Sequence, residues 1–283
     1  MHEEPSSWAD FLFGLSLFQE AILTGMVAGA ALGLLGVFIV LRRMVFVTAG
    51  LTQAAGLGVV LSFFAAIHLG VEVHPVLGAV LASLVAALAL SAPSERLRIS
   101  RESVLAAVWL LGSAGAVLFG SRILQEAHDV HAILFGPAVL VRPEDFVLVT
   151  GIGLGALLLA YPARRVLVFV GFDPDGARVQ GLPVAWLEFG LLAVITLVVS
   201  VSTRALGALP VFAFSVAPAV AALMAAPRLS WVFPLAIVGG ALSGFAGYLG
   251  AWRFDFPVGA SQATAALLLV VLAVPVRLAR GTA

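Results

Sequence analysis

Two histidines and an aspartate lie close enough along the chain to bind a metal ion. His128, Asp129 and His131 fall within four positions, and on a helix the two imidazoles would share a face. Imidazole nitrogen and carboxylate oxygen are ligands that zinc and similar divalent ions accept. No fourth ligand is evident in the pattern. The same residues are therefore also interpretable as solvated loop positions, or as contacts to a second protein that delivers an ion.

Motifs for covalent catalysis and for nucleotide hydrolysis are missing from the sequence. The chain contains neither lysine nor cysteine, which excludes a phosphate-binding Gly-x-x-x-x-Gly-Lys motif and thiolate metal sites. No His-Glu-x-x-His or Gly-x-Ser-x-Gly pattern occurs, and no basic patch favours nucleic acid. We therefore expect no enzyme activity, no covalently bound cofactor and no nucleic-acid partner. Any ATP would be used by a separate subunit.

The composition is that of an integral membrane protein. Of 283 residues, 62 % are hydrophobic and 11 % charged, with a mean hydropathy of +1.14. A helix needs about 20 mainly apolar residues to cross about 30 Å of hydrocarbon. The sequence predicts an all-α, polytopic fold of eight or nine spans in one membrane domain covering 1–283. The predicted spans are 18–41, 45–68, 75–93, 103–122, 144–162, 185–203, 207–226, 231–251 and 258–278.

Arginine distribution predicts the orientation of these spans. All fifteen basic residues are arginines at or near span ends, and an outer N-terminus leaves only four of them outside. Those four are Arg122, Arg142, Arg204 and Arg253. Because basic residues favour the cytoplasmic side, we expect an outer N-terminus and a cytoplasmic C-terminus. The expected localisation is the cytoplasmic (inner) membrane, with no cleaved signal because the first ten residues are acidic.

A polar segment at 163–183 interrupts the spans and is expected to be a cytoplasmic loop. Within it, Asp173 fits an N-cap, Pro174 the first helical position and Gly181 a helix stop, which predicts a helix over 174–180. A short polar helix beside a membrane is typical of a surface that meets a partner protein. It could also lie against anionic lipid headgroups.

Polar and helix-distorting residues occur inside two of the predicted spans. Gln53 predicts that the span 45–68 faces protein, where it would line a path or hydrogen-bond a neighbouring helix. Pro218 in the span 207–226 frees backbone carbonyls that, with Ser215, could contact a substrate. The residues that predict close packing between helices are Gly25, Gly29, Gly33, Gly240 and Gly244.

Short motifs in a fixed order resemble the permease subunits of bacterial ABC importers for zinc, manganese and iron. They extend over most of the chain: GVFIVLRRM at 36–44, LTQAAGLG at 51–58, ILFG at 133–136, PED at 143–145, FDPD at 172–175, GLP at 181–183, PA at 218–219 and DFPVG at 255–259. The resemblance implies a type II importer-like permease that imports a divalent metal ion. Two such permeases form a homodimeric path, ATP-binding subunits dock from the cytoplasm, and an extracytoplasmic metal-binding protein delivers the ion.

The resemblance also assigns roles to residues. It implies that the helix at 174–180 is the coupling helix that contacts the ATP-binding subunit. The coupling residues implied are Asp173, Pro174, Asp175, Arg178 and Gly181. The residues expected to line the translocation path are Thr48, Thr52, Gln53, Ser215 and Pro218.

At the expected metal site the chain departs from the family pattern. The family that this chain resembles usually has a pattern like Gly-Asp-x-Leu-Ser-His-Ala on the second span. Here Ala49 replaces the aspartate and Gln53 replaces the histidine. A histidine of the fourth span is also replaced, with Trp109 and Leu110 nearby. Neutral side chains do not supply the charge that makes a dry site attractive to a divalent ion. A metal ion thus stays the predicted substrate, with a changed or non-metal substrate of the same kind of permease as the alternative.

Two further alternatives have a different mechanism. A secondary transporter coupled to an ion gradient needs carboxylates within the membrane, and Glu188, at the edge of the span 185–203, is the nearest candidate. A membrane scaffold would account for the missing metal ligands but not for the capped helix at 174–180.

Overall fold

The computed structural model describes residues 8–91, 100–123 and 141–281. Within these ranges the chain is all-α, as predicted, and has no strand. The elements are α1 (Trp8–Leu41), α2 (Val45–Phe64), the π-helical turn η1 (Ala65–Leu69), α3 (Pro75–Ser91), α5 (Arg101–Gly120), α7 (Pro143–Phe172), α8 (Pro174–Val179), α9 (Val184–Leu206), α10 (Ala208–Ala225), α11 (Leu229–Phe254) and α12 (Val258–Gly281).

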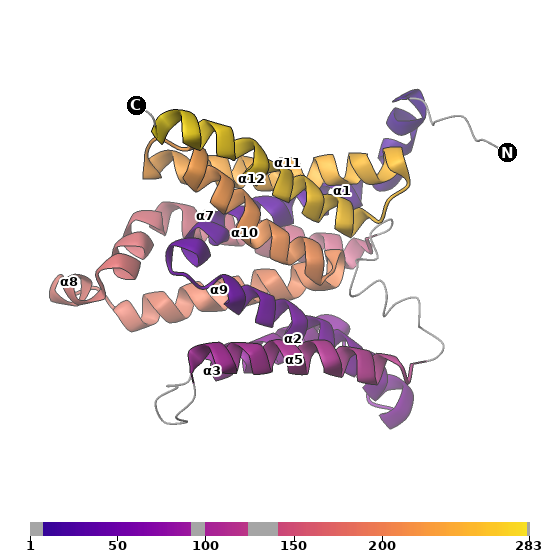
Figure 1. Cartoon of the computed structure of the whole chain (residues 1–283). Helices are drawn as coiled ribbons and strands as arrows, with labels where there is room; N and C mark the ends of the chain where they lie inside the picture. The colour runs from indigo at the N-terminus through magenta and orange to yellow at the C-terminus, as the bar shows by residue number, and fades with distance from the viewer. Residues whose placement is uncertain (1–7, 92–99, 124–140, 282–283) are drawn as a thin grey trace.

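The long helices lie side by side in one bundle, with α1 at its centre (Figure 1). α1 packs against α7, α9, α10 and α11, and every residue from 28 to 39 is buried. α2 packs against α3 and α5 on one side and against α9 and α10 on the other. The core therefore forms around two consecutive helices, α1 and α2, which a short turn connects and which both pack against α9 and α10.

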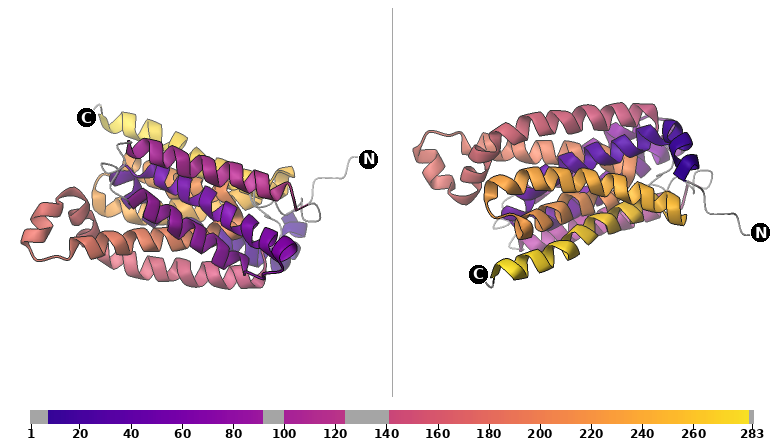
Figure 2. Two further views of the ribbon diagram at one scale, coloured as in Figure 1. Left: turned by 90° about the horizontal axis from the view of Figure 1, so that it is seen from below. Right: turned by 90° about the horizontal axis from the view of Figure 1, so that it is seen from above.

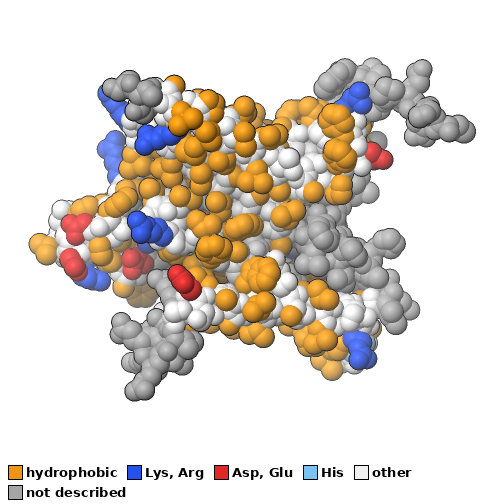
Figure 3. Space-filling model, in the orientation of Figure 1, with side chains coloured by type: hydrophobic (Ala, Val, Ile, Leu, Met, Phe, Trp, Pro, Cys, Tyr) orange, Lys and Arg blue, Asp and Glu red, His pale blue; other side chains and the backbone are white. Residues whose placement is uncertain are grey.

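Eight helices within the described residues are long and apolar enough to cross a membrane, and α3, with 17 residues, is a shorter apolar helix. Each lies at one of the nine predicted spans, so the protein is a multi-pass membrane protein. Apolar side chains cover the middle of the visible face, and charged ones gather mainly toward its two ends (Figure 3). This distribution fits a hydrocarbon layer around the middle of the bundle.

The predicted loop at 163–183 is wrong over its first ten residues. α7 continues through Pro162 to Phe172, so only the segment after α7 lies outside the long helices. Arg164, which suggested a loop, folds back along the helix. Its Nη1 donates to the Tyr161 carbonyl oxygen across 2.7 Å, and its guanidinium lies 4.1 Å from the Tyr161 ring centroid. Proline and arginine near a membrane helix end therefore do not mark that end reliably.

Close packing of α1 against α11 confirms the prediction from glycine spacing. A Cβ atom at Gly29 would overlap the carbonyl oxygen of Gly240, and one at Gly240 would overlap that of Gly29. The two backbones are therefore in direct contact, which only glycine permits at these positions.

Two connections at the ends of helices are very short. Gly207 alone separates α9 from α10. Its φ is 95°, a backbone conformation that residues other than glycine rarely adopt. Asp255 ends α11 in the left-handed region with a φ of 56°. The Phe256 N–H then donates to the Ala251 carbonyl oxygen across 3.1 Å.

The α8 segment projects beyond the rest of the bundle in all three views (Figures 1 and 2). α1 begins at the opposite end of the molecule, whereas α12 ends on the same side as α8 (Figure 1). The described chain thus begins and ends on opposite sides of the bundle, and α8 lies on the side where it ends.

Candidate functional site

Two residues predicted for the translocation path contact each other between α2 and α10. The hydroxyl oxygens of Ser215 and Thr48 lie 3.3 Å apart, and both residues are fully buried. The Thr48 hydroxyl donates to the Val45 carbonyl oxygen across 2.7 Å, and the single proton of the Ser215 hydroxyl is shared between Thr48 Oγ1 and the Phe212 carbonyl oxygen, 2.8 Å away. The pair therefore joins two helices and has its hydrogen-bonding capacity largely satisfied within the protein.

The same point is also a contact with α1. A Cβ atom at Gly36 would overlap the Ser215 carbonyl oxygen, so α1 and α10 touch through their backbones there. Pro218 lies one turn further along α10 and is buried too. Thr48, Ser215 and Pro218 thus lie where α1, α2 and α10 meet.

Thr52 and Gln53 differ in their surroundings. Thr52 is buried, and its Oγ1 donates to the Ala49 carbonyl oxygen across 2.9 Å. Gln53 is half-buried, and α5 approaches it so closely that a Cβ atom at Gly112 would lie 2.8 Å from the Gln53 Cβ. The expectation that α2 faces protein at Gln53 is therefore confirmed.

An open groove of about 700 Å³ lies between α2, α5 and α10. Ala49 and Trp109, which lie at or near the positions where the motif resemblance implies metal ligands, both line it. The described residues that line it are Phe46, Ala49, Glu102, Leu105, Ala106, Trp109, Leu110 and Phe212. Among them only Glu102 carries a charge, at the start of α5. The fold thus brings Ala49 and Trp109 to one groove with apolar side chains, whereas Gln53 does not line it.

α8 has the capping pattern that the sequence predicts. The Asp173 carboxylate accepts a hydrogen bond from the Gly176 N–H across 2.8 Å, and Pro174 is the first helical residue. Gly181 follows the helix with a φ of 77°. Asp175 and Arg178 form an exposed ion pair with 2.5 Å between Oδ1 and Nη1. The structure thus forms the predicted helix, ending at Val179 instead of Gln180.

Sequence reasoning missed the apolar side of this helix. Ala177 is fully buried and packs with Val170 of α7 and Val184 of α9, which holds α8 against the ends of both long helices. On the outside, Val179 is 89 % exposed. Phe172, just before α8, is also exposed. Exposed apolar side chains on a projecting, capped helix are typical of a contact surface.

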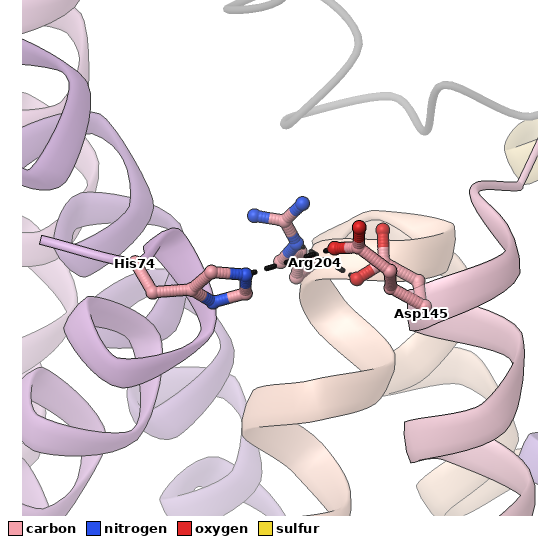
Figure 4. A network of polar contacts seen from close by, with 4 residues as sticks. His74, Asp145 and Arg204 are labelled. Atoms are coloured by element: carbon pink, nitrogen blue, oxygen red, sulfur yellow. Dashed lines mark hydrogen bonds and ion pairs between the residues drawn. The ribbon is translucent and has the colours of Figure 1, made fainter.

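Figure 4 shows a network of charged residues. It lies at the start of α7 and the end of α9, the ends of these helices that are remote from α8. Arg204 near the end of α9 donates from Nε to Asp145 Oδ1 across 2.9 Å, and both side chains are buried. Next to this pair, His74 Nε2 lies 3.8 Å from Glu144 Oε2, and both of these side chains are largely exposed. The network joins the starts of α3 and α7 to the end of α9.

The predicted metal ligands His128, Asp129 and His131 lie outside the described residues. In the part of the chain that the structure describes, no three His, Asp or Glu side chains come close enough to hold a metal ion.

Known membrane proteins resemble this chain over three quarters or more of its length. The manganese transport system membrane protein MntC of Halalkalibacterium halodurans is 28 % identical over 93 % of this chain and 88 % of its own length. The chelated iron transport system membrane protein YfeD of Yersinia pestis is 31 % identical over 75 % of this chain and 69 % of its own length.

A solved structure has the same fold. PsaBC from Streptococcus pneumoniae, determined in complex with a Fab, is 26 % identical and covers 96 % of this chain and 98 % of its own, with a TM-score of 0.83. The family model described as ABC 3 transport family matches residues 15–277. Because that match spans nearly the whole chain, this protein belongs to the ABC 3 transport family.

Proposed function

We propose that this chain is the permease subunit of an ATP-driven importer whose substrate is a divalent metal ion, manganese or iron in the first place. The near full-length likeness to the manganese transport membrane protein and to PsaBC carries the proposal, and the likeness to the iron transport membrane protein over three quarters of the chain supports it. Zinc, which the sequence motifs also implied, is a third candidate ion. The permease itself has no nucleotide-binding motif, so a separate ATP-binding subunit hydrolyses ATP.

We infer that α8 is the docking element for that subunit. Its cap, its projection from the bundle and its exposed Val179 support this role, and the arginine distribution favours a cytoplasmic location for this end. The N-terminus then lies on the outer side of the cytoplasmic membrane, and the C-terminus lies in the cytoplasm. A second copy of the permease completes the path, and an extracytoplasmic metal-binding protein delivers the ion to the opposite end of the bundle.

A changed substrate is the second candidate function. The groove at Ala49 is lined mainly by apolar and aromatic side chains, including Trp109 and Phe212. A bare divalent ion loses its hydration shell in such a place and finds only one charged residue, Glu102, in the lining. A substrate that brings its own ligands, or that is not a metal, would avoid this cost.

Reconstitution with the partner proteins tests the proposal. The permease is purified with its ATP-binding subunit, placed in liposomes with the binding protein, and supplied with manganese, iron or zinc salts. Metal uptake that requires ATP, with hydrolysis stimulated by the loaded binding protein, is the expected result. A complex that hydrolyses ATP but takes up none of the three ions would instead support the changed substrate. If no ATP-binding subunit copurifies with the permease, both candidate functions are contradicted.

A further inference from the structure

Arg42 lies in the turn between α1 and α2, at the same end of the bundle as α8. The turn is tight: the Arg43 N–H donates to the Val40 carbonyl oxygen across 3.0 Å, and the Met44 N–H to that of Ile39 across 2.8 Å. Arg43 itself has a φ of 56°, which a residue other than glycine seldom adopts. Such a strained turn persists only where its surroundings hold it in place.

The Arg42 side chain reaches away from this turn to both helices that flank α8. Its Nη2 donates to the Leu167 carbonyl oxygen of α7 across 3.0 Å, and its Nη1 lies 3.7 Å from Glu188 Oε1 of α9. The side chain is only 14 % exposed. Burial lowers the pKa of Arg42 while the Glu188 carboxylate opposes this effect, and a guanidinium stays charged at neutral pH.

α7 leaves space for this guanidinium. A Cβ atom at Gly171 would lie 2.9 Å from Arg42 Nε, so an alanine there would push the side chain aside. A void of about 10 Å³ next to it is lined in part by Phe38, Leu167 and Gly171. The arginine is therefore closely surrounded by protein on the side of α7.

Movement of α8 would reach Arg42 through packed side chains. Ala177 of α8 packs between Val170 and Val184, which lie three residues beyond Leu167 in α7 and four residues before Glu188 in α9. On the other side, α2 begins three residues after Arg42 and places Thr48 in contact with Ser215 of α10. The chain of contacts thus connects α8 to the helices that line the groove.

We propose that Arg42 is the positioning residue that transmits displacement of α8 to α2, so that binding and release of the ATP-binding subunit alter the groove between α2, α5 and α10. One charged side chain holds the ends of α7 and α9 to the α1–α2 turn, and the tight turn passes its movement to α2. This inference rests on the proposed function, because α8 must be the docking element for the transmission to matter.

The test measures how many ATP molecules are hydrolysed for each ion taken up by the reconstituted complex. Arg42→Gln should keep the ATP-binding subunit attached and hydrolysis within about twofold of the wild type, while uptake falls about tenfold. Arg42→Lys, a point charge that does not span both helices, should fall in between. Arg165→Gln is the matched control, because it changes an exposed arginine in the part of α7 that Arg42 contacts. It should keep the wild-type ratio.

Three outcomes overturn the inference: an unchanged ratio in Arg42→Gln, an equal loss of hydrolysis and uptake, or the same uncoupling in Arg165→Gln. If Arg42→Gln fails to insert, Glu188→Gln and Gly171→Ala decide. Both variants keep Arg42 in the sequence. Glu188→Gln weakens its ion pair, and Gly171→Ala displaces its side chain, so both should raise the ratio of ATP hydrolysed to ions taken up. A wild-type ratio in both contradicts the proposal. A wild-type complex that takes up no metal contradicts the proposed function instead, so the two failures are distinguishable.

Discussion

Arg204 donates a hydrogen bond to Asp145 across 2.9 Å, with side chains that are only 7 % and 9 % exposed. The pair joins the end of α9 to the start of α7. At the opposite end of the same two helices, Arg42 contacts both α7 and α9. An arginine therefore links this helix pair at each end, and the two helices are held as one unit that carries α8.

Removing one member of the buried pair should strongly destabilise the protein. Asp145→Asn leaves the Arg204 charge buried without its partner, at a cost of about 3 to 5 kcal/mol. The expected result is a clearly lower thermal unfolding midpoint in detergent. Glu144→Gln is the control, because its contact to His74 is exposed and contributes about 1 kcal/mol or less. Equal midpoints for the two variants would contradict a stabilising role of the buried pair.

Asp173→Ala should weaken coupling by removing the N-cap of α8. The Gly176 N–H loses its acceptor, which costs about 1 kcal/mol within a helix of only six residues. We expect less ATP-binding subunit to copurify and less ATP-dependent uptake, with normal membrane insertion. Asp173→Asn retains an accepting oxygen and should behave nearly as the wild type. Normal copurification and uptake in Asp173→Ala would argue against α8 as the docking element.

Alanine at a glycine in the α1–α11 contact should separate these helices. Gly240→Ala places a methyl group against the Gly29 carbonyl, so the backbones must move apart and the unfolding midpoint should fall. Gly155→Ala in α7 is the matched control, because nothing lies within 4 Å of the added carbon and alanine favours the helix. A midpoint for Gly240→Ala at or above that of Gly155→Ala would contradict this packing.

A carboxylate in the groove should increase its affinity for divalent ions. Ala49→Asp places a negative charge among the groove residues, at the position where the motif resemblance implies an aspartate. We expect metal to stimulate ATP hydrolysis at about tenfold lower concentration, because hard divalent ions favour carboxylate oxygen. Ala49→Asn adds similar volume without charge and should leave the concentration dependence unchanged. The same shift in both variants would exclude an electrostatic cause.

Impermeant thiol reagents applied to intact cells test the orientation. The chain has no native cysteine, so single cysteines report their own positions. His74→Cys should be labelled and Arg43→Cys should not, since the arginine distribution favours an outer location for residue 74 and an inner one for residue 43. Both positions are exposed, which keeps the comparison fair. Labelling at residue 43 alone would show that the orientation is the opposite of the proposed one.

Local signals were sufficient to predict the helices and α8. Hydropathy located every span, and Asp173, Pro174 and Gly181 predicted the short helix because capping depends on neighbouring residues only. The continuation of α7 past Pro162 was not predictable in this way. A membrane helix tolerates proline where its surroundings satisfy the freed backbone groups, and those surroundings belong to the tertiary structure.

Contacts between distant residues could not be predicted from a single sequence. Arg42 and Leu167 are 125 positions apart, and Arg204 and Asp145 are 59 apart. Each arginine stands near a span end, where the sequence favours a solvated residue, and only the fold shows that both are buried. The family resemblance singled out Ala49 and Trp109, but the groove that both residues line became evident only in the structure.

The one-residue connection at Gly207 fixes the rotation of α10 about its axis relative to α9. A single residue inserted into a helix turns everything beyond it by about 100°. Since no loop between α9 and α10 can absorb such a turn, Ser215 would then face away from Thr48. This part of the chain therefore tolerates substitution better than a change in length, and its spacing is a constraint on which variants of the protein can exist.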